Sequence, residues 1–196
     1  MKSYRAKELD EQLIYKLLSG SVVPRPIAWL TTQNEEGLVN VAPFSFFNVA
    51  SANPPLLSVA FTGEKDSYLN LRTTKEAVVH LINSDNVILM NQTAAKLAAN
   101  ESEAEKFALD LEPSQIVNVP SLVKSRVRFE TQLYQDISLG REGHLVLLEV
   151  VSLSFTDDVI DTEKFYIDIE ALGPIARLAG NDYAKLGESF KIERPP

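Results

Sequence analysis

The run from Ser125 to Tyr134 alternates apolar and polar side chains, and this pattern restricts the fold more than any other part of the chain. The apolar positions are Val127, Phe129, Thr131 and Leu133, and the polar positions are Arg126, Arg128, Glu130 and Gln132. Successive side chains of a strand point to opposite faces of a sheet, so a period of two predicts one buried face and one polar face. The run therefore indicates a half-buried strand of an antiparallel sheet.

Short runs rich in β-branched and aromatic residues, separated by Pro, Gly and Asn, predict several further strands. They lie near residues 26–33, 38–47, 55–62, 77–83, 145–155 and 164–169. The polar tip from Gln33 to Gly37 joins the first two into a hairpin, because Gly37 can take a positive φ. A second turn is predicted from Gly140 to Gly143.

Two segments have sequence patterns typical of helices. Leucines at helical spacing predict an amphipathic helix over 7–18 that stops at Gly20, and an Ala-, Leu- and Glu-rich segment predicts a helix over 86–109, broken near Asn100. Because strands outnumber helices and no regular β–α–β alternation occurs, we expect a mainly β fold with helical excursions, an antiparallel barrel that is closed or nearly so. The chain is predicted to be one domain, 1–196, with an N-terminal helix within 1–20 and an irregular tail, 171–196.

Composition excludes several kinds of site. The chain has no Cys, which excludes disulfides, zinc ribbons, iron–sulfur clusters and thiol nucleophiles, and its two His make a His-built metal site improbable. Nineteen Lys and Arg against 27 Asp and Glu give a net charge of −8, which disfavours a nucleic-acid partner. The N-terminus has no uninterrupted apolar core of a secretory signal, and no apolar stretch is long enough to span a membrane. We therefore expect a soluble, cytoplasmic protein.

Common catalytic motifs are missing from the sequence. It contains no Gly-x-Ser-x-Gly elbow, no Gly-rich dinucleotide fingerprint and no phosphate-binding loop that ends in Gly-Lys-Ser/Thr. A hydrolase or a Rossmann-type nucleotide site is therefore not supported, and any phosphate site must be built in another way.

Two segments could line a ligand site near the first predicted strands. Arg25 lies between Pro24 and Pro26, and these prolines give its guanidinium a restricted backbone, although a surface Arg at the start of a strand is the plainer interpretation. The second segment, residues 40–49, interleaves three Phe with Ser45 and two Asn. That mixture offers flat apolar walls and polar donors to a planar heterocycle, whereas the structural alternative is an aromatic core layer.

A third segment, residues 62–70, could bind a phosphate. Asp66 or Ser67 could cap a helix that begins here, which would leave Lys65 and the first backbone amides free for an anion. The simpler alternative is a capped helix with no ligand.

These segments, taken in order, resemble the flavin reductase-like family of FMN-binding split-barrel flavoproteins, in the branch described as flavoprotein oxygenase-associated. The matching motifs are PRPIAW at 24–29, the Gly37 hairpin, NVAPFSFFN at 40–48, NPP at 53–55, KDS at 65–67 with Asn70, EPS at 112–114, RFE at 128–130, and Pro174-Ile175, Arg177-Leu178, Gly180 and Tyr183. The resemblance implies a six-stranded Greek-key barrel, a homodimer with FMN at or near its interface, and electron transfer from NAD(P)H or a protein donor.

The resemblance also implies roles for individual residues. Those placed around the flavin are Arg25, Pro26, Ile27, Ala42, Pro43, Phe44, Ser45 and Phe46. Backbone amides within residues 42–48 would lie near the polar edge of the ring. Lys65 and Ser67 would bind the phosphate, Asp66 would fix the loop, and Tyr183 would cover the site. A charge near flavin N1, from Arg25 or a neighbouring subunit, would stabilise the reduced anion.

The sequence departs from the family pattern at three of its positions. Relatives usually carry Thr in place of Ser67, many carry Asn in place of His80, and Thr131 often corresponds to Cys. The hydroxyl of Ser67 keeps phosphate binding plausible, whereas we interpret His80 as a hydrogen-bonded strand residue and His144 as a surface residue.

The leading functional hypothesis is an FMN-dependent NAD(P)H:flavin oxidoreductase. Because the flavin would carry out the hydride chemistry, the protein needs no catalytic acid, base or nucleophile of its own. Such an enzyme would pass electrons to free flavin or a small acceptor, with an oxygenase as a conceivable partner. Two alternatives are an FMN-binding electron-transfer protein without turnover, and a barrel without flavin that serves as an interaction module.

Overall fold

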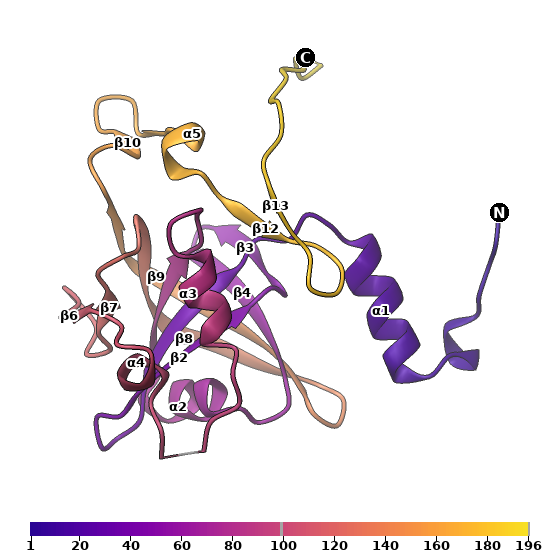
Figure 1. Ribbon diagram of the computed structural model, residues 1–196, viewed down its shortest axis with the longest axis horizontal. Coiled ribbons are helices and arrows are strands. Elements are labelled where there is room, and N and C mark those ends of the chain that lie inside the picture. The colour runs from indigo at the N-terminus through magenta and orange to yellow at the C-terminus, as the bar shows by residue number, and fades with distance from the viewer. Residues whose placement is uncertain (99, 196) are drawn as a thin grey trace.

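The computed structural model describes residues 1–98 and 100–195, and its main feature is a seven-stranded antiparallel sheet that curls into a barrel (Figure 1). Its strands are β1 (Ala28–Gln33), β2 (Val39–Phe44), β3 (Phe47–Ala52), β4 (Pro55–Thr62), β5 (Glu76–Leu81), β8 (Val127–Leu139) and β9 (Gly143–Phe155). They are ordered β2-β1-β5-β8-β9-β4-β3. The expected mainly β fold with helical excursions is confirmed.

The sheet has seven strands rather than six because the predicted strand 38–47 is divided. β2 and β3 lie at opposite edges of the sheet, yet only Ser45 and Phe46 separate them along the chain. The chain therefore crosses from one edge to the other at these two residues, where the backbone N–H of Ala60 donates to the carbonyl of Phe46 at 2.8 Å. If β2 and β3 are counted as one bent strand, the expected six remain.

The remaining elements are short. The helices are η1 (Ala6–Glu8), α1 (Glu11–Ser21), α2 (Asp66–Thr74), α3 (Val87–Gln92), α4 (Glu103–Lys106) and α5 (Ile169–Leu172). The two-stranded pairs are β6 (Leu111–Glu112) with β7 (Ser121–Leu122), β10 (Ile160–Asp161) with β11 (Tyr166–Ile167), and β12 (Ile175–Arg177) with β13 (Tyr183–Lys185). Of the described residues, no helix combines the length and the apolar character needed to cross a membrane.

The predicted helix over 86–109 was wrong in extent. α3 ends where the Thr93 hydroxyl donates to the carbonyl of Met90 at 2.7 Å and accepts the indole N–H of Trp29 at 2.9 Å. A new start follows at Ser102, whose hydroxyl oxygen accepts the N–H of Glu105 at 3.3 Å as the N-cap of α4. The expected break is confirmed, but α3 ends already at Gln92 and α4 begins only at Glu103, so less of 86–109 is helical than expected.

The terminal segments also differ from expectation. α1 continues through Gly20 to Ser21, and the predicted last strand, 164–169, is only the two-residue β11. The tail, 171–196, contains the β12–β13 hairpin instead of being irregular throughout, and its last residue lies outside the described residues. The hairpin is ordered by a tertiary contact, because the backbones of Arg25 and Arg177 exchange two hydrogen bonds, at 3.1 and 2.9 Å.

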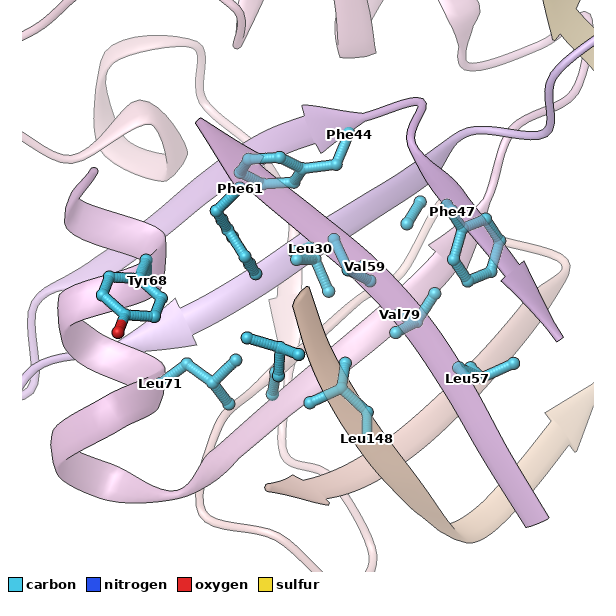
Figure 2. Packing of buried hydrophobic residues seen from close by; sticks show 13 residues of the cluster. Leu30, Phe44, Phe47, Leu57, Val59, Phe61, Tyr68, Leu71, Val79 and Leu148 are labelled. Atoms are coloured by element: carbon cyan, nitrogen blue, oxygen red, sulfur yellow. The ribbon is translucent and has the colours of Figure 1, made fainter. Parts of the chain in front are cut away.

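The barrel interior is an apolar core closed at one end by α2 (Figure 2). Alternate residues of the strands point inward, and Tyr68 and Leu71 of α2 pack against them. The opposite face of β1 is also buried, because Trp29 packs in a second cluster with Met90 of α3 and Leu122 of β7. α2 is therefore fixed by the core, and its first turn lies at a defined place on the barrel.

A buried carboxylate holds the loop between β6 and β7. Glu130 is only 3% exposed, and it accepts the backbone N–H groups of Gln115, Ile116 and Val117 at 2.7–3.1 Å. Nearby, the guanidinium of Arg128 donates to Glu112. The motifs at 112–114 and 128–130 therefore have a structural role, since they hold this loop on the barrel.

His80 is a structural residue, as interpreted from the sequence. It is fully buried, its Nδ1–H donates to the carbonyl of Trp29, and its Nε2 accepts the N–H of Leu122, both at 2.9 Å. Burial lowers the pKa of His80 to about 3, because a charged imidazolium would lose its hydration. The imidazole is therefore neutral in the folded protein.

This neutral His80 makes the protein sensitive to acid. In the unfolded chain its pKa is about 6.5, so below that pH the unfolded state binds a proton that the folded state does not. The stability that neutral His80 contributes is fully present above pH 6.5. The free energy of unfolding should then fall by about 1.4 kcal/mol per pH unit as the pH drops toward 3. Urea unfolding of the wild type and of His80→Gln, compared between pH 7 and 4.5, checks this. An equal pH dependence in both proteins would contradict it.

Candidate functional site

Two adjoining cavities border the outer side of β2. The Arg25 cavity has a volume of about 700 Å³, and the Lys65 cavity has a volume of about 370 Å³. Pro43 and Ala94 line both of them, so the two cavities adjoin at these residues and are together called the cleft. The wall opposite β2 comes from α3 and residues 93–97, a segment that the sequence analysis did not assign to the site. The cleft is large enough for a planar ligand with a polar tail.

Arg25 is a wall of the larger cavity and is 8% exposed. Its guanidinium donates to three backbone carbonyls: those of Ser19, of Val22 at 2.8 Å and of Leu178 at 2.9 Å. A longer bond of 3.4 Å runs from its Nε to the hydroxyl of Ser45. Arg25 therefore joins α1, the tail and the β2–β3 crossing, and the interpretation of a plain surface Arg was wrong.

The tail supplies a second cation and an aromatic ring to the same cavity. The guanidinium of Arg177 lies 4.5 Å from the ring centre of Tyr183 and also donates to its hydroxyl. The Tyr183 hydroxyl in turn donates to the Oδ1 atom of Asn91 at 3.0 Å. The predicted cover, Tyr183, thus does line the cavity, whereas the sequence analysis gave no role to Arg177 or Asn91. Arg177 was part of the quoted C-terminal motif, which was the available signal.

The three Phe side chains of the segment 40–49 lie in different environments. Phe44 and Phe47 lie in the barrel core, with the Phe44 ring 4.6 Å from that of Phe61. Phe46 packs outside, 6.1 Å from the ring of Tyr15 on α1. Among the described residues, the cavity surfaces in this segment come from Asn40, Ala42, Pro43, Phe44 and Ser45. The expected flat wall is therefore made more by β2 itself than by a stack of three Phe rings.

The segment at 24–27 is divided between two sides of the barrel. Arg25 and Ile27 line the Arg25 cavity. Pro26 points to a separate apolar cavity of about 420 Å³, which Phe47 and Leu153 also line. This separation follows from the strand-like backbone, in which neighbouring side chains alternate in direction.

The Lys65 cavity contains the first turn of α2. Neither Asp66 nor Ser67 caps the helix as expected: Lys65 occupies the N-cap position, and no side chain accepts a hydrogen bond from the first turn. Lys65, Asp66 and Ser67 all line the cavity, and Lys96 lies on its other wall. Uncapped amides and two lysines suit an anion such as a phosphate.

A buried polar network forms part of the wall of this cavity. Glu103 is 5% exposed, and its Oε2 atom accepts the Nδ2–H of Asn40 at 2.7 Å and the N–H of Val41 at 3.0 Å. The Oδ1 atom of Asn40 accepts the hydroxyl of Ser67 at 2.5 Å. Burial raises the pKa of Glu103, because a carboxylate loses hydration there. Asn40 belongs to the candidate segment 40–49, but Glu103 was not predicted, and only the fold brings the two together.

A third polar cluster lies at the α2 end of the barrel. The Tyr68 hydroxyl contacts Oδ2 of Asp136 at 2.7 Å and Nδ1 of His144 at 2.8 Å. The rings of Tyr68 and His144 stack with their centres 4.2 Å apart. Burial raises the pKa of Tyr68, and the bond to Asp136 adds to the effect. The expectation that His144 is a plain surface residue was wrong. This cluster anchors the helix whose first turn lines the Lys65 cavity.

Comparison with known proteins places these features in a family. The family described as "Flavin reductase like domain" matches residues 19–170. The uncharacterized protein YwrF of Bacillus subtilis (strain 168) is 43% identical over 100% of both chains. The crystal structure of nitrilotriacetate monooxygenase component B from Bacillus cereus has a TM-score of 0.95 at 39% identity and covers 98% of each chain. The structure of Pseudomonas fluorescens 2-nitrobenzoate 2-nitroreductase NbaA has a TM-score of 0.93 at 31% identity, covering 99% of this chain and 96% of that chain.

Proposed function

The chain belongs to the flavin reductase like domain family and has its split-barrel fold, and from that premise we propose that it is an FMN-dependent NAD(P)H:flavin oxidoreductase. The observation that carries the proposal is the cleft along β2, whose two adjoining cavities differ in chemistry. One end holds Lys65 and the uncapped first turn of α2, and the other is a larger cavity bordered by Ser45 and Tyr183. Such a cleft suits a ligand with an anionic tail and a planar ring.

The chemical groups that line the cleft suit the phosphate and the ring of FMN. Lys65 and the first amides of α2 would bind the phosphate, and the Ser45 hydroxyl would serve the polar edge of the ring. Arg25 holds the walls together through its carbonyl partners and adds positive charge beside Ser45. When bound, the flavin would supply the hydride and electron chemistry, so these residues need only bind, orient and exclude water.

The electron acceptor is proposed to be free flavin or a small molecule. The names of the two solved relatives include a monooxygenase component and a nitroreductase. By analogy, this chain would deliver reduced flavin to an oxygenase partner or reduce a small acceptor directly.

We also propose that the protein is a homodimer. α1 lies beside the barrel, where Figure 1 shows it extending away from the sheet. Its apolar side chains Leu13, Leu17 and Leu18 are all more than 40% exposed. A second copy of the chain that covers this face would remove that apolar surface from water.

The first test is the purified protein without added cofactor. We expect a yellow protein that releases FMN on heating, oxidises NADH or NADPH with added flavin, and has the mass of a dimer by light scattering. FMN binding with negligible NAD(P)H oxidation would instead favour the electron-transfer alternative. A colourless protein that also fails to bind added FMN would overturn the proposal in favour of an interaction module.

Removing the charge of Lys65 should weaken FMN binding selectively. Lys65→Gln is expected to raise the Kd for FMN by about 10- to 100-fold, because a charged contact with the phosphate is lost. Riboflavin has no phosphate, so its Kd should stay within about twofold. Flavin fluorescence titration measures both, and Lys75→Gln at the opposite end of α2 is the matched control. An equal loss of affinity for FMN and riboflavin would place the phosphate elsewhere.

A further inference from the structure

We propose that Glu103 is a positioning residue that sets the direction of the hydrogen bonds in the wall of the Lys65 cavity, so that a dianionic phosphate binds there together with one proton. The inference rests on the proposed function, because the phosphate in question is that of FMN. It adds a property that the cleft alone does not imply, namely that cofactor affinity depends on the protonation of a buried carboxyl group in the cavity wall.

The observed network has one direction. An ionised carboxylate can only accept hydrogen bonds, so Glu103 requires Asn40 to turn its NH₂ group toward it. The carbonyl oxygen of Asn40 must then face Ser67, whose O–H donates to it at 2.5 Å. The orientation in the structure is therefore the one that an ionised Glu103 requires.

This direction is unfavourable for a phosphate. A serine hydroxyl has one proton, and that of Ser67 is committed to Asn40, so only lone pairs remain for the cavity. A dianionic phosphate oxygen also offers only lone pairs. While Glu103 is ionised, Ser67 therefore cannot donate to the phosphate, and the negative carboxylate adds repulsion.

Protonation of Glu103 reverses the chain of bonds. The new carboxyl O–H donates to the Asn40 carbonyl once the amide has turned over, and the amide NH₂ then donates to the Ser67 oxygen. The Ser67 O–H is released to the phosphate. One O–H bond forms, at the carboxyl group, with a proton from solvent, and the Val41 N–H can remain on Glu103 throughout.

The charged groups near Glu103 either raise its pKa or line the Lys65 cavity. Burial raises the pKa of Glu103, and Asp66 raises it further. Glu64, Lys65 and Lys96 line the same cavity, where the lysines would attract the phosphate. On the helix of Glu103 itself, Glu105 is exposed, and Lys106 is paired with Glu101 at 3.7 Å. A bound phosphate would add negative charge beside Glu103 and so favour its protonated form.

The test is proton uptake on flavin binding, measured by titration calorimetry at pH 7.0–8.5 in two buffers with different heats of ionisation. In this range the wild type should take up close to one proton per FMN, and its affinity should fall by up to about tenfold per pH unit. Riboflavin binding should take up almost none. Glu103→Gln cannot be protonated but supplies an NH₂ group to the Asn40 carbonyl, so it should bind FMN without proton uptake and with little pH dependence.

The outcomes separate the inference from the proposed function. FMN binding with no proton uptake in the wild type, or with equal uptake in Glu103→Gln, would overturn the inference and leave the proposed function intact. Failure of the wild type to bind FMN at any pH would overturn both. If Glu103→Gln does not fold, the comparison of FMN with riboflavin in the wild type decides alone, because equal uptake for the two ligands would exclude a phosphate-linked proton.

Discussion

Replacing Arg25 with alanine is expected to lower the free energy of unfolding by about 3–5 kcal/mol and to abolish detectable flavin binding. The side chain is almost fully buried, and its removal leaves the carbonyls of Ser19, Val22 and Leu178 without their charged donor. These carbonyls belong to α1 and the tail, so both walls of the Arg25 cavity should loosen together.

Urea unfolding and flavin fluorescence titration measure the two effects of Arg25→Ala. Arg25→Lys keeps the charge but lacks the planar fork that reaches several acceptors, so we expect an intermediate loss of stability. Arg5→Ala is the control, because Arg5 forms only an exposed ion pair with Glu8 and should change stability by less than about 0.5 kcal/mol. Stability and flavin affinity of Arg25→Ala equal to those of Arg5→Ala would contradict the role assigned to this residue.

Replacing Glu130 with alanine is expected to cost about 3–5 kcal/mol of stability without a direct effect on the cleft. Three backbone N–H groups of the loop at 115–117 would lose a shared, buried carboxylate. The loss should be local first, so amide hydrogen exchange at Gln115, Ile116 and Val117 should accelerate more than exchange in the barrel core.

Glu130→Gln removes the charge of the side chain but keeps its shape. A neutral amide retains one carbonyl acceptor, and it should therefore recover part of the stability lost in Glu130→Ala. Glu149→Ala on the neighbouring strand β9 serves as the control for removing a carboxylate from the same sheet. Unchanged exchange at residues 115–117 in Glu130→Ala would show that the carboxylate does not hold this loop.

Local patterns in the sequence were sufficient to predict most of the sheet. The alternating run from 125 to 134 lies within β8 from Val127 onward, and the polar tip before Gly37 joins β1 to β2 as expected. The division of 38–47 was not predictable in this way, because both halves are strand-like and only closure of the barrel separates them. The same holds for the tail, where β12 is ordered by the backbone of Arg25, more than 150 residues earlier in the chain.

The candidate site was predictable only in part, for a related reason. Residues such as Lys65 and Ser45 belong to unusual local segments, and the structure does place them on one cleft. Glu103 lies in an ordinary acidic helix, and nothing nearby in the sequence indicates that it meets Asn40 inside the protein. Asn91 likewise becomes a neighbour of Tyr183 only when the tail folds back over α3, whereas Arg177 faces Tyr183 within the β12–β13 hairpin itself.

The two ends of the Arg25 cavity come from opposite ends of the chain. Tyr15 and Ser19 precede the barrel, whereas Arg177 and Tyr183 follow it. During synthesis the ribosome releases the first wall long before the second, so a nascent chain that already contains every barrel strand still has an open, half-built cavity. A flavin that binds in this cavity as proposed can therefore be enclosed only after Arg177 and Tyr183 have been synthesised, and a chain truncated before Arg177 would form a barrel that lacks one wall of this cavity.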